Sequence, residues 1–177
     1  MMHRGQIRTP QGTQWLTLPV HPEDKKKPLN EVRLAKDKDW VPTFLTALHL
    51  SYRNSVYYDF FEAEIESDFY EASNLDSLLD AVLFLSNKLF LYTEWPIKPT
   101  LLNSKSETKK VIEQSNPDCI LMEPGSRYFR PVFPERKEAD FSLPVYRQHF
   151  EGFEPNCCLL DVLFQYGPES YQIFDAL

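Results

Sequence analysis

Two adjacent cysteines, Cys157 and Cys158, open an apolar segment near the end of the chain, within FEPNCCLLDVLFQYGPES at 153–170. Asn156 is a favourable helix N-cap and Gly167 a favourable helix stop, so the pattern predicts a helix with both cysteines in its first turn. Unpaired amides and the helix dipole favour negative charge there and lower the pKa of a thiol. Because the thiolate is the nucleophilic form of cysteine, this spacing indicates a reactive thiol.

Two further side chains complete a candidate catalytic set around Cys158. Asp161 lies three residues later, on the same helix face, and His149 ends the segment that leads into the helix. The three residue types suit a nucleophile, a base and a group that orients the base. Two other interpretations stay open, namely buried cysteines that pack the helix start and thiols that contact a ligand. A carboxylate one turn from the thiol also raises its pKa, which opposes the catalytic interpretation.

A second set of polar and aromatic side chains is predicted to face a ligand, from strand ends, a long loop and the helix start. Arginine binds carboxylate or phosphate through two parallel hydrogen bonds, and aromatic rings stack on sugars or bases. For any single residue of this set, the alternative role is a surface ion pair. The set comprises Arg4, Arg8, Arg127, Tyr128, Arg130, Tyr146, Gln148 and Asn156.

The elements that must position these residues form a mixed α/β arrangement, with short strands at both ends of the chain and a helical middle. A hairpin is expected at 7–18, where TPQG supplies a type I turn, and further strands at 30–36, 118–122 and 145–150. Apolar residues at helical spacing predict helices from Trp40 with Asp39 as cap, within 55–70, from Asn74 to about Leu91, and at 106–116. The proline-rich stretch 123–144 is expected to be a lid or binding loop.

The overall composition fits one domain over residues 1–177, in which 42% hydrophobic residues supply a core. A net charge of −7 argues against nucleic-acid binding, which clustered basic residues drive. No apolar run approaches the roughly 20 residues of a membrane span, and no signal peptide is recognised at the start. Three cysteines without paired metal-ligand spacing predict no metal site and no cofactor, and indicate free thiols in a reducing cytoplasm.

Three stretches of the chain resemble the WbqC-like family of bacterial proteins, in the form common among Bacteroidetes. They are HRGQIRTPQGTQWLTLPV, VRLAKDKDW with ALHLSYRNSVYYDFFE, and LPVYRQHFEGFEPNCCLLDVLFQYGPES. The last is the most specific, with Tyr-x-Gln-x-Phe and Phe-x-Pro-Asn ahead of an apolar helix that holds Asp and ends in Gly-Pro-Glu-Ser. The positions that match family signatures are Arg4, Trp40, Tyr146, Gln148, Phe150, Pro155, Asn156, Asp161 and Gly167.

The resemblance implies work on sugar nucleotides or aminosugars in the synthesis of O-antigen and other surface polysaccharides. One expected activity is transfer of an acyl or aminoacyl group to a sugar amine. The other is non-catalytic binding of a nucleotide-sugar, or of a glycosyltransferase partner, in the same pathway. The family usually has a further N-terminal segment with a Gln-Pro-x-Tyr-x-Pro motif, which this chain is expected to lack. It often has serine where Cys158 stands, which suits either a nucleophile or a small capping residue.

Overall fold

A computed structural model describes residues 3–95 and 144–174 of the chain. These residues form one antiparallel hairpin followed by helices, which confirms the predicted class, mixed α and β in one domain. In chain order the elements are β1 (Arg4–Thr9), β2 (Gly12–Thr17), the 3-10 turns η1 (Pro22–Asp24) and η2 (Leu29–Glu31), α1 (Val41–Tyr52), α2 (Tyr58–Ser73), α3 (Leu78–Tyr92), α5 (Leu159–Tyr166), η3 (Gly167–Ser170) and α6 (Tyr171–Phe174).

Several predictions fall on residues outside those ranges. They are the helix at 106–116, the strand at 118–122, nearly all of the loop at 123–144, and the ligand-facing candidates Arg127, Tyr128 and Arg130. These stay predictions.

The hairpin forms as predicted. β1 and β2 pair antiparallel with Thr9 opposite Gly12, and Pro10 lies in the turn between them. Gly12 has φ +123°, a conformation that glycine adopts without steric cost. Side chains alternate between the two faces of the hairpin, and the face that carries Ile7 and Leu16 is buried against the helices.

The free edge of β1 is covered by other parts of the chain. The carbonyl of Gln6 accepts a 2.7 Å hydrogen bond from the amide of Cys158, at the start of α5. The amide of Arg8 donates a 2.8 Å hydrogen bond to the hydroxyl of Tyr52, at the end of α1. An uncovered strand edge invites pairing with another chain, so these contacts protect the hairpin and fix α5 against it.

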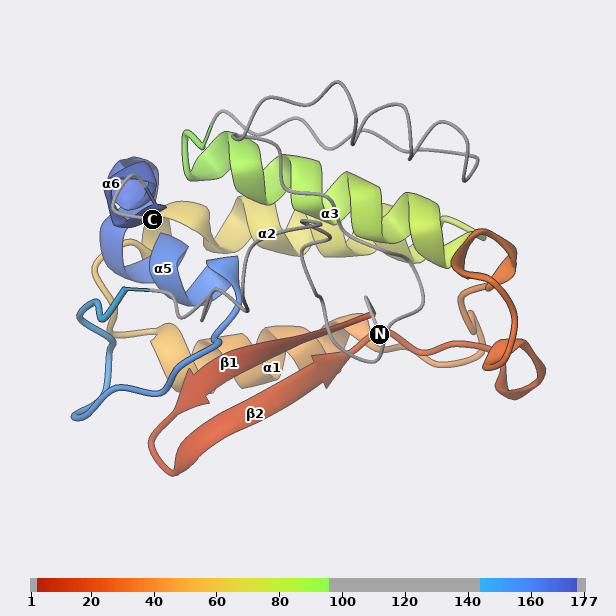
Figure 1. The fold of residues 1–177 in the computed structure, drawn as a ribbon, viewed down its shortest axis with the longest axis horizontal. Helices are drawn as coiled ribbons and strands as arrows, with labels where there is room; N and C mark the ends of the chain where they lie inside the picture. Colours follow the sequence, from red (N-terminus) through yellow and green to blue (C-terminus); the bar gives the residue numbers. More distant parts are fainter. Residues whose placement is uncertain (1–2, 96–143, 175–177) are drawn as a thin grey trace, which may run out of the picture.

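The helices lie on one side of the hairpin, and α1 and α5 contact β1. Figure 1 shows α2 and α3 side by side, α1 behind the hairpin, and α5 near the ends of α1 and α3, where it also contacts β1. The rings of Trp40, Phe44 and Phe69 meet edge to face in the core, with centroids 4.8–5.8 Å apart. In residues 3–95 and 144–174, no helix combines the length and apolar content needed to cross a membrane.

Two predicted helix starts are wrong. Trp40, rather than Asp39, is the N-cap of α1, and no side-chain hydrogen bond caps this helix. Asn74 ends α2 instead of beginning α3, and its side-chain amide donates to the carbonyl of Tyr70 at 3.0 Å. α3 begins later because the hydroxyl of Ser77 accepts a hydrogen bond from the amide of Asp80, which is the usual N-cap geometry.

Two predicted strands also differ from the structure. Residues 30–36 contribute isolated bridges, Val20 with Leu34 and Arg33 with Ser77, instead of a continuous strand. The strand predicted at 145–150 is wrong, because residues 144–148 are irregular and 149–150 form a bend. The cause is Gln148, whose side chain bonds both the amide and the carbonyl of Glu154 and so folds the segment back on itself.

Candidate functional site

The two cysteines lie just outside the helix that they were predicted to open. α5 begins at Leu159 with Cys158 as its N-cap, and Cys157 precedes it. Asn156 has φ +66°, so it turns the chain instead of capping the helix. The reason is the hydrogen bond from the amide of Cys158 to β1, which sets where the helix can start. The predicted stop at Gly167 is confirmed.

Neither thiol is acidic, which contradicts the predicted effect of the helix dipole. Burial is the largest cause that raises the pKa of Cys158, which reaches about 11; the carboxylate of Asp161 acts in the same direction, and hydrogen bonds from the backbone amides at the helix start lower the pKa without offsetting the burial. Burial likewise raises the pKa of Cys157 to about 12. Cys157 is 4% exposed and its thiol donates a weak hydrogen bond to the carbonyl of Glu154 at 3.6 Å, so it packs the fold.

Asp161 is the centre of a buried polar network. Its Oδ1 accepts a 2.7 Å hydrogen bond from the hydroxyl of Tyr52. Its Oδ2 accepts one from the hydroxyl of Tyr146 at 2.7 Å and one from Nε2 of Gln148 at 3.1 Å. Asp161 and Tyr52 are 0% exposed, and Tyr146 and Gln148 are 6% exposed. Three of the residues chosen from the sequence, Tyr146, Gln148 and Asp161, are therefore in direct contact.

The electrostatics of this network suit a structural carboxylate. Burial raises the pKa of Asp161, while the hydroxyl donors from Tyr146 and Tyr52 lower it by stabilising the charged form. Burial and the same carboxylate raise the pKa of both tyrosines, which therefore stay protonated as donors. The network joins α1, α5 and the segment around Gln148, and it holds the start of α5 against β1.

The arrangement does not assemble the predicted Cys–His–Asp set. Both oxygens of Asp161 are occupied by Tyr52, Tyr146 and Gln148, and within residues 3–95 and 144–174 no hydrogen bond joins His149 to Cys158 or Asp161. The ring of His149 instead packs edge to face with Phe150, with centroids 4.8 Å apart.

Cys158 does line a cavity, of about 180 Å³, between the hairpin and α3. Most of the wall is apolar and comes from β2 and the helices α1, α2, α3 and α5. Gly5 makes room for the cysteine, since a Cβ at Gly5 would lie 3.2 Å from Cβ and 3.3 Å from Sγ of Cys158. The polar residues of the wall are His3, Arg4, Asp68, Ser86, Lys88 and Cys158.

Asp68 and Lys88 form a closed pair in this wall. Asp68 is 3% exposed, and it accepts from Lys88 at 2.8 Å and from the hydroxyl of Tyr92 at 2.7 Å. The hydrogen bond to Asp68 raises the pKa of Lys88. Lys88 is thus neutralised in place, which leaves Arg4 as the cation of the wall that has no carboxylate partner among the described residues.

His3 is a residue of this cavity that the sequence analysis missed. Its Nδ1 is buried and has no hydrogen-bond partner within the described residues. Burial and the charge of Arg4 lower the pKa of His3, so its imidazole is neutral at pH 7. The signal that could have found His3 is strand alternation, which places His3 on the same buried face of the hairpin as Gly5 and Ile7. The hairpin pairing extends this far, because the amide of Leu18, directly after β2, donates to the carbonyl of His3.

The other ligand-facing candidates have different environments. The guanidinium of Arg4 lies 4.4 Å from the ring centre of Trp15, whose side chain is 50% exposed. Arg8 is 5% exposed and donates to the carbonyls of Thr9, Gly12 and Glu151, so it holds the hairpin turn. Asn156 is exposed at the turn before α5. Among the described residues, no group of three or more His, Cys, Asp or Glu side chains has the geometry to hold a metal.

Comparison with known proteins places these residues in a family. An uncharacterised protein of Mycobacterium tuberculosis, Rv1507c, is 24% identical in an alignment of 186 positions that covers 95% of this chain and 78% of that protein. No solved structure gives a significant match. The WbqC-like protein family matches residues 1–173, a region that contains the hairpin, the cavity residues and the Asp161 network. The chain belongs to the WbqC-like protein family.

Proposed function

We propose that the protein binds a sugar nucleotide whose sugar carries an apolar group, such as an N-acyl or deoxy substituent, during the synthesis of surface polysaccharides. The observation that carries this proposal is one cavity in which Cys158, His3 and Arg4 lie among apolar walls. The resemblance to proteins of O-antigen gene clusters supports this choice of pathway.

The size and lining of the cavity decide which part of the ligand it takes. Sites for whole small molecules usually measure about 300–1,000 Å³, and this cavity measures about 180 Å³. It therefore accommodates one group of a larger ligand. Because the wall is mainly apolar, that group is a methyl or acyl substituent instead of a phosphate, which needs hydrogen-bond donors all round.

Arg4 is the group best placed to hold the anionic part of the ligand. Arg4 lines the cavity at the start of β1, and its exposed side chain extends over Trp15 on the outer face of the hairpin, so it is available to a part of the ligand that lies outside the cavity. The other cation of the wall, Lys88, is paired with the buried Asp68. The cation–π contact of Arg4 with the Trp15 ring uses none of the guanidinium N–H groups, so these stay available to bind phosphate through two hydrogen bonds. Trp15 thus orients Arg4 without using its donors.

The thiol in the cavity supports a second candidate function, transfer of an acyl group through Cys158 to a sugar amine. In that reaction the thiol loses its proton to a base and attacks the acyl carbonyl of a thioester donor, which releases the donor's thiol and leaves the acyl group on Cys158; the sugar amine then attacks this thioester, takes the acyl group as an amide and frees the Cys158 thiol. His3 is a neutral base in the same wall. A pKa of about 11 leaves only about 1 thiol in 10,000 ionised at pH 7, so binding without covalent chemistry fits the cavity better.

The experiment is isothermal titration with UDP, UDP-glucosamine and UDP-N-acetylglucosamine, together with the dTDP-linked 4-acetamido-4,6-dideoxyhexose. We expect the N-acylated and deoxy sugars to bind at least about tenfold more tightly than UDP-glucosamine or UDP alone, because about 55 Å² or more of apolar surface enters the cavity. Leu85→Trp, which fills the cavity, removes this preference. Arg4→Gln weakens every nucleotide, and Arg147→Gln, at an exposed arginine outside the cavity, is its matched control.

Equal affinity for all four compounds in the unaltered protein, or no binding at all, would refute the proposal. A mass spectrum of the protein after incubation with acetyl-coenzyme A separates the two candidate functions. An acetyl adduct on the peptide that contains Cys158, absent in Cys158→Ala, favours transfer. Unchanged nucleotide-sugar binding by Cys158→Ala with no adduct favours binding alone.

A further inference from the structure

A second hollow, of about 410 Å³, lies where the loop that follows β2 meets the start of α3. Its volume falls within the range usual for small-molecule sites. The side chains that supply its polar groups are His21, Arg33, Lys36, Asp37, Lys38 and Asp76. We call this hollow the loop groove, and none of its residues takes part in the cavity that contains Cys158.

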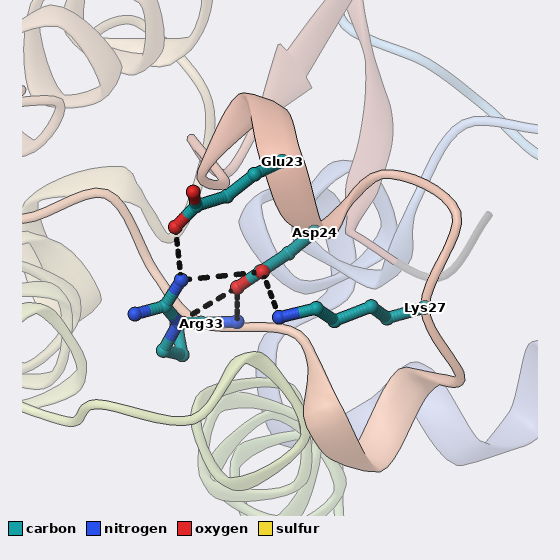
Figure 2. Close-up of polar contacts among 4 residues, drawn as sticks. All are labelled: Glu23, Asp24, Lys27 and Arg33. Atoms are coloured by element: carbon teal, nitrogen blue, oxygen red, sulfur yellow. Dashed lines mark hydrogen bonds and ion pairs between the residues drawn. The ribbon is translucent and has the colours of Figure 1, made fainter.

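Arg33 is held rigidly at the loop groove by the carboxylates behind it. Figure 2 shows Asp24 and Glu23 converging on its guanidinium, with Lys27 on the far side of Asp24. Oδ2 of Asp24 accepts from Nε of Arg33 at 2.8 Å and from its backbone amide at 3.1 Å, and Nη2 is shared between Asp24 and Glu23. The hydrogen bond from Arg33 holds the pKa of Asp24 well below its usual range, so this carboxylate is ionised.

The clamp that Asp24 and Glu23 form on Arg33 leaves one guanidinium nitrogen unused. Nη1 of Arg33 has no partner within the described residues, and Figure 2 shows it pointing away from both carboxylates. An arginine fixed on two of its three nitrogens has already lost its side-chain entropy, so a ligand that bonds the third does not have to order it. The clamp therefore pre-organises a hydrogen-bond donor at the loop groove.

The charges around the loop groove balance. Lys36 is paired with Asp76 at 2.6 Å and also donates to the carbonyl of Asn74. Lys38 and Asp37 are exposed and make no ion pair within the described residues. The groove and the clamp together contain the cations Lys27, Arg33, Lys36 and Lys38 and the carboxylates Glu23, Asp24, Asp37 and Asp76.

A balanced set of donors and acceptors, of which Arg33 is held in place, suits a neutral ligand that is rich in hydroxyl groups. A phosphate or carboxylate needs an excess of positive charge, which this groove lacks. A hydroxyl both donates and accepts, so it can bond Nη1 of Arg33 or the ammonium of Lys38 and at the same time the carboxylate of Asp37. Neutral saccharides present such hydroxyls in adjacent pairs.

We propose that the loop groove is a carbohydrate-binding site for a neutral di- or trisaccharide unit, distinct from the sugar-nucleotide cavity. It would hold a growing or finished glycan, with Arg33, Asp37 and Lys38 as the bonding groups. The proposal is independent of the function assigned to the cavity, because the two hollows share no residue.

The test is saturation-transfer-difference NMR on the full chain with cellobiose, N,N′-diacetylchitobiose and a rhamnose disaccharide, followed by titration of whichever saccharide gives signals. We expect a double variant, Asp37→Ala with Lys38→Ala, to weaken binding at least about tenfold, since hydrogen bonds to charged groups are lost. Glu64→Ala with Arg147→Ala is the matched control, because it removes one acidic and one basic exposed side chain elsewhere and leaves the affinity unchanged. The cavity variant Leu85→Trp also leaves it unchanged.

Arg33→Lys adds a second measurement, because lysine keeps the charge but cannot bond Asp24 and a ligand in the same plane. It should weaken saccharide binding even where its melting temperature shows a folded protein. Absence of signal from all three saccharides, or equal affinity in the Asp37/Lys38 double variant and the unaltered protein, would overturn the proposal. Tight binding of inorganic phosphate in place of the saccharides would overturn it as well, since the groove would then be an anion site.

Discussion

The hydroxyl of Tyr52 donates a 2.7 Å hydrogen bond to Oδ1 of Asp161, 109 residues further along the chain. The same hydroxyl accepts a 2.8 Å hydrogen bond from the amide of Arg8. One buried oxygen atom thereby connects the end of α1 with the edge of β1 and the first turn of α5. Because Cys158 lies at that turn, this contact fixes the position of the thiol beside the cavity.

Replacing Tyr52 with phenylalanine should destabilise the protein by about 3 kcal/mol, since the amide of Arg8 and a carboxylate oxygen of Asp161 both lose their buried partner. Urea unfolding followed by circular dichroism measures this change. Tyr70→Phe is the matched control, because the side chain of Tyr70 is 46% exposed, and a loss below about 0.5 kcal/mol is expected there. Similar losses in the two variants would contradict the structural role of the Tyr52 hydroxyl.

Local sequence signals predicted the elements whose contacts are local. The turn from Thr9 to Gly12 and the stop at Gly167 depend on residue types at fixed spacing, and both are found. The strand predicted at 145–150 failed because the side chain of Gln148 bonds the backbone of Glu154 and folds the segment back, and because β1 offers it no free edge. Both edges of the hairpin's first strand were already taken, by β2 and by the contacts of Tyr52 and Cys158, which no local pattern reveals.

In the candidate site, too, the sequence predicted what depends on residue type and missed what depends on tertiary contacts. Asp161 was predicted as part of a catalytic set, and Tyr146 and Gln148 as part of a separate ligand-facing set, but the three bond one another in the interior. Burial of a polar group is a tertiary property, so residue type alone could not separate the two roles. His3 was missed because its importance comes from the cavity formed with Cys158, more than 150 residues away in the chain.

The stability of the protein should fall in acid through Asp24. Hydrogen bonds from Arg33 and Lys27 hold the folded-state pKa of Asp24 well below the unfolded value of about 4. A depressed folded pKa stabilises the protein above the unfolded pKa, and this contribution is lost progressively as the pH falls below about 4. Between pH 5 and pH 2, the melting temperature of the unaltered protein should therefore drop more steeply than the melting temperature of Asp24→Asn.

Asp39→Asn is the control for that measurement, since Asp39 is exposed and makes no ion pair within the described residues. It should keep the pH profile of the unaltered protein. If Asp24→Asn keeps that profile too, the clamp on Arg33 does not depend on the charge of Asp24.

The two described thiols should react slowly with alkylating reagents at neutral pH. With pKa values of about 11 and 12, the rate of alkylation of Cys158 and of Cys157 should rise about tenfold per pH unit from pH 7 to pH 10. Iodoacetamide labelling, quantified by mass spectrometry of the peptide that contains both, measures the profile. In guanidinium chloride the rate should instead level off near pH 9, because the burial that raises both pKa values is gone. A plateau below pH 8 in the folded protein would restore the reactive thiol that the sequence alone suggested.

Gly167 and Gly152 both have positive φ, +57° and +82°, so alanine at either should cost at least about 1 kcal/mol. Gly167 also has ψ −136°, outside the left-handed helical region, which adds backbone strain there. A Cβ at Gly152 meets nothing within 4 Å, whereas one at Gly167 would lie 2.6 Å from ring atoms of Tyr57. Gly167→Ala should therefore cost about 2 kcal/mol more than Gly152→Ala in urea unfolding.

The ring of Tyr57 cannot move aside freely, because its backbone amide donates a 3.0 Å hydrogen bond to the carbonyl of Phe164 in α5. Adding Tyr57→Ala to Gly167→Ala should consequently recover part of the extra loss, since the crowded ring is gone while that backbone bond remains. Tyr57→Ala alone costs stability through its lost packing, so the comparison is the double-mutant coupling between positions 57 and 167. Purely additive effects would mean that the cost at Gly167 is conformational strain and that the end of α5 tolerates the larger side chain.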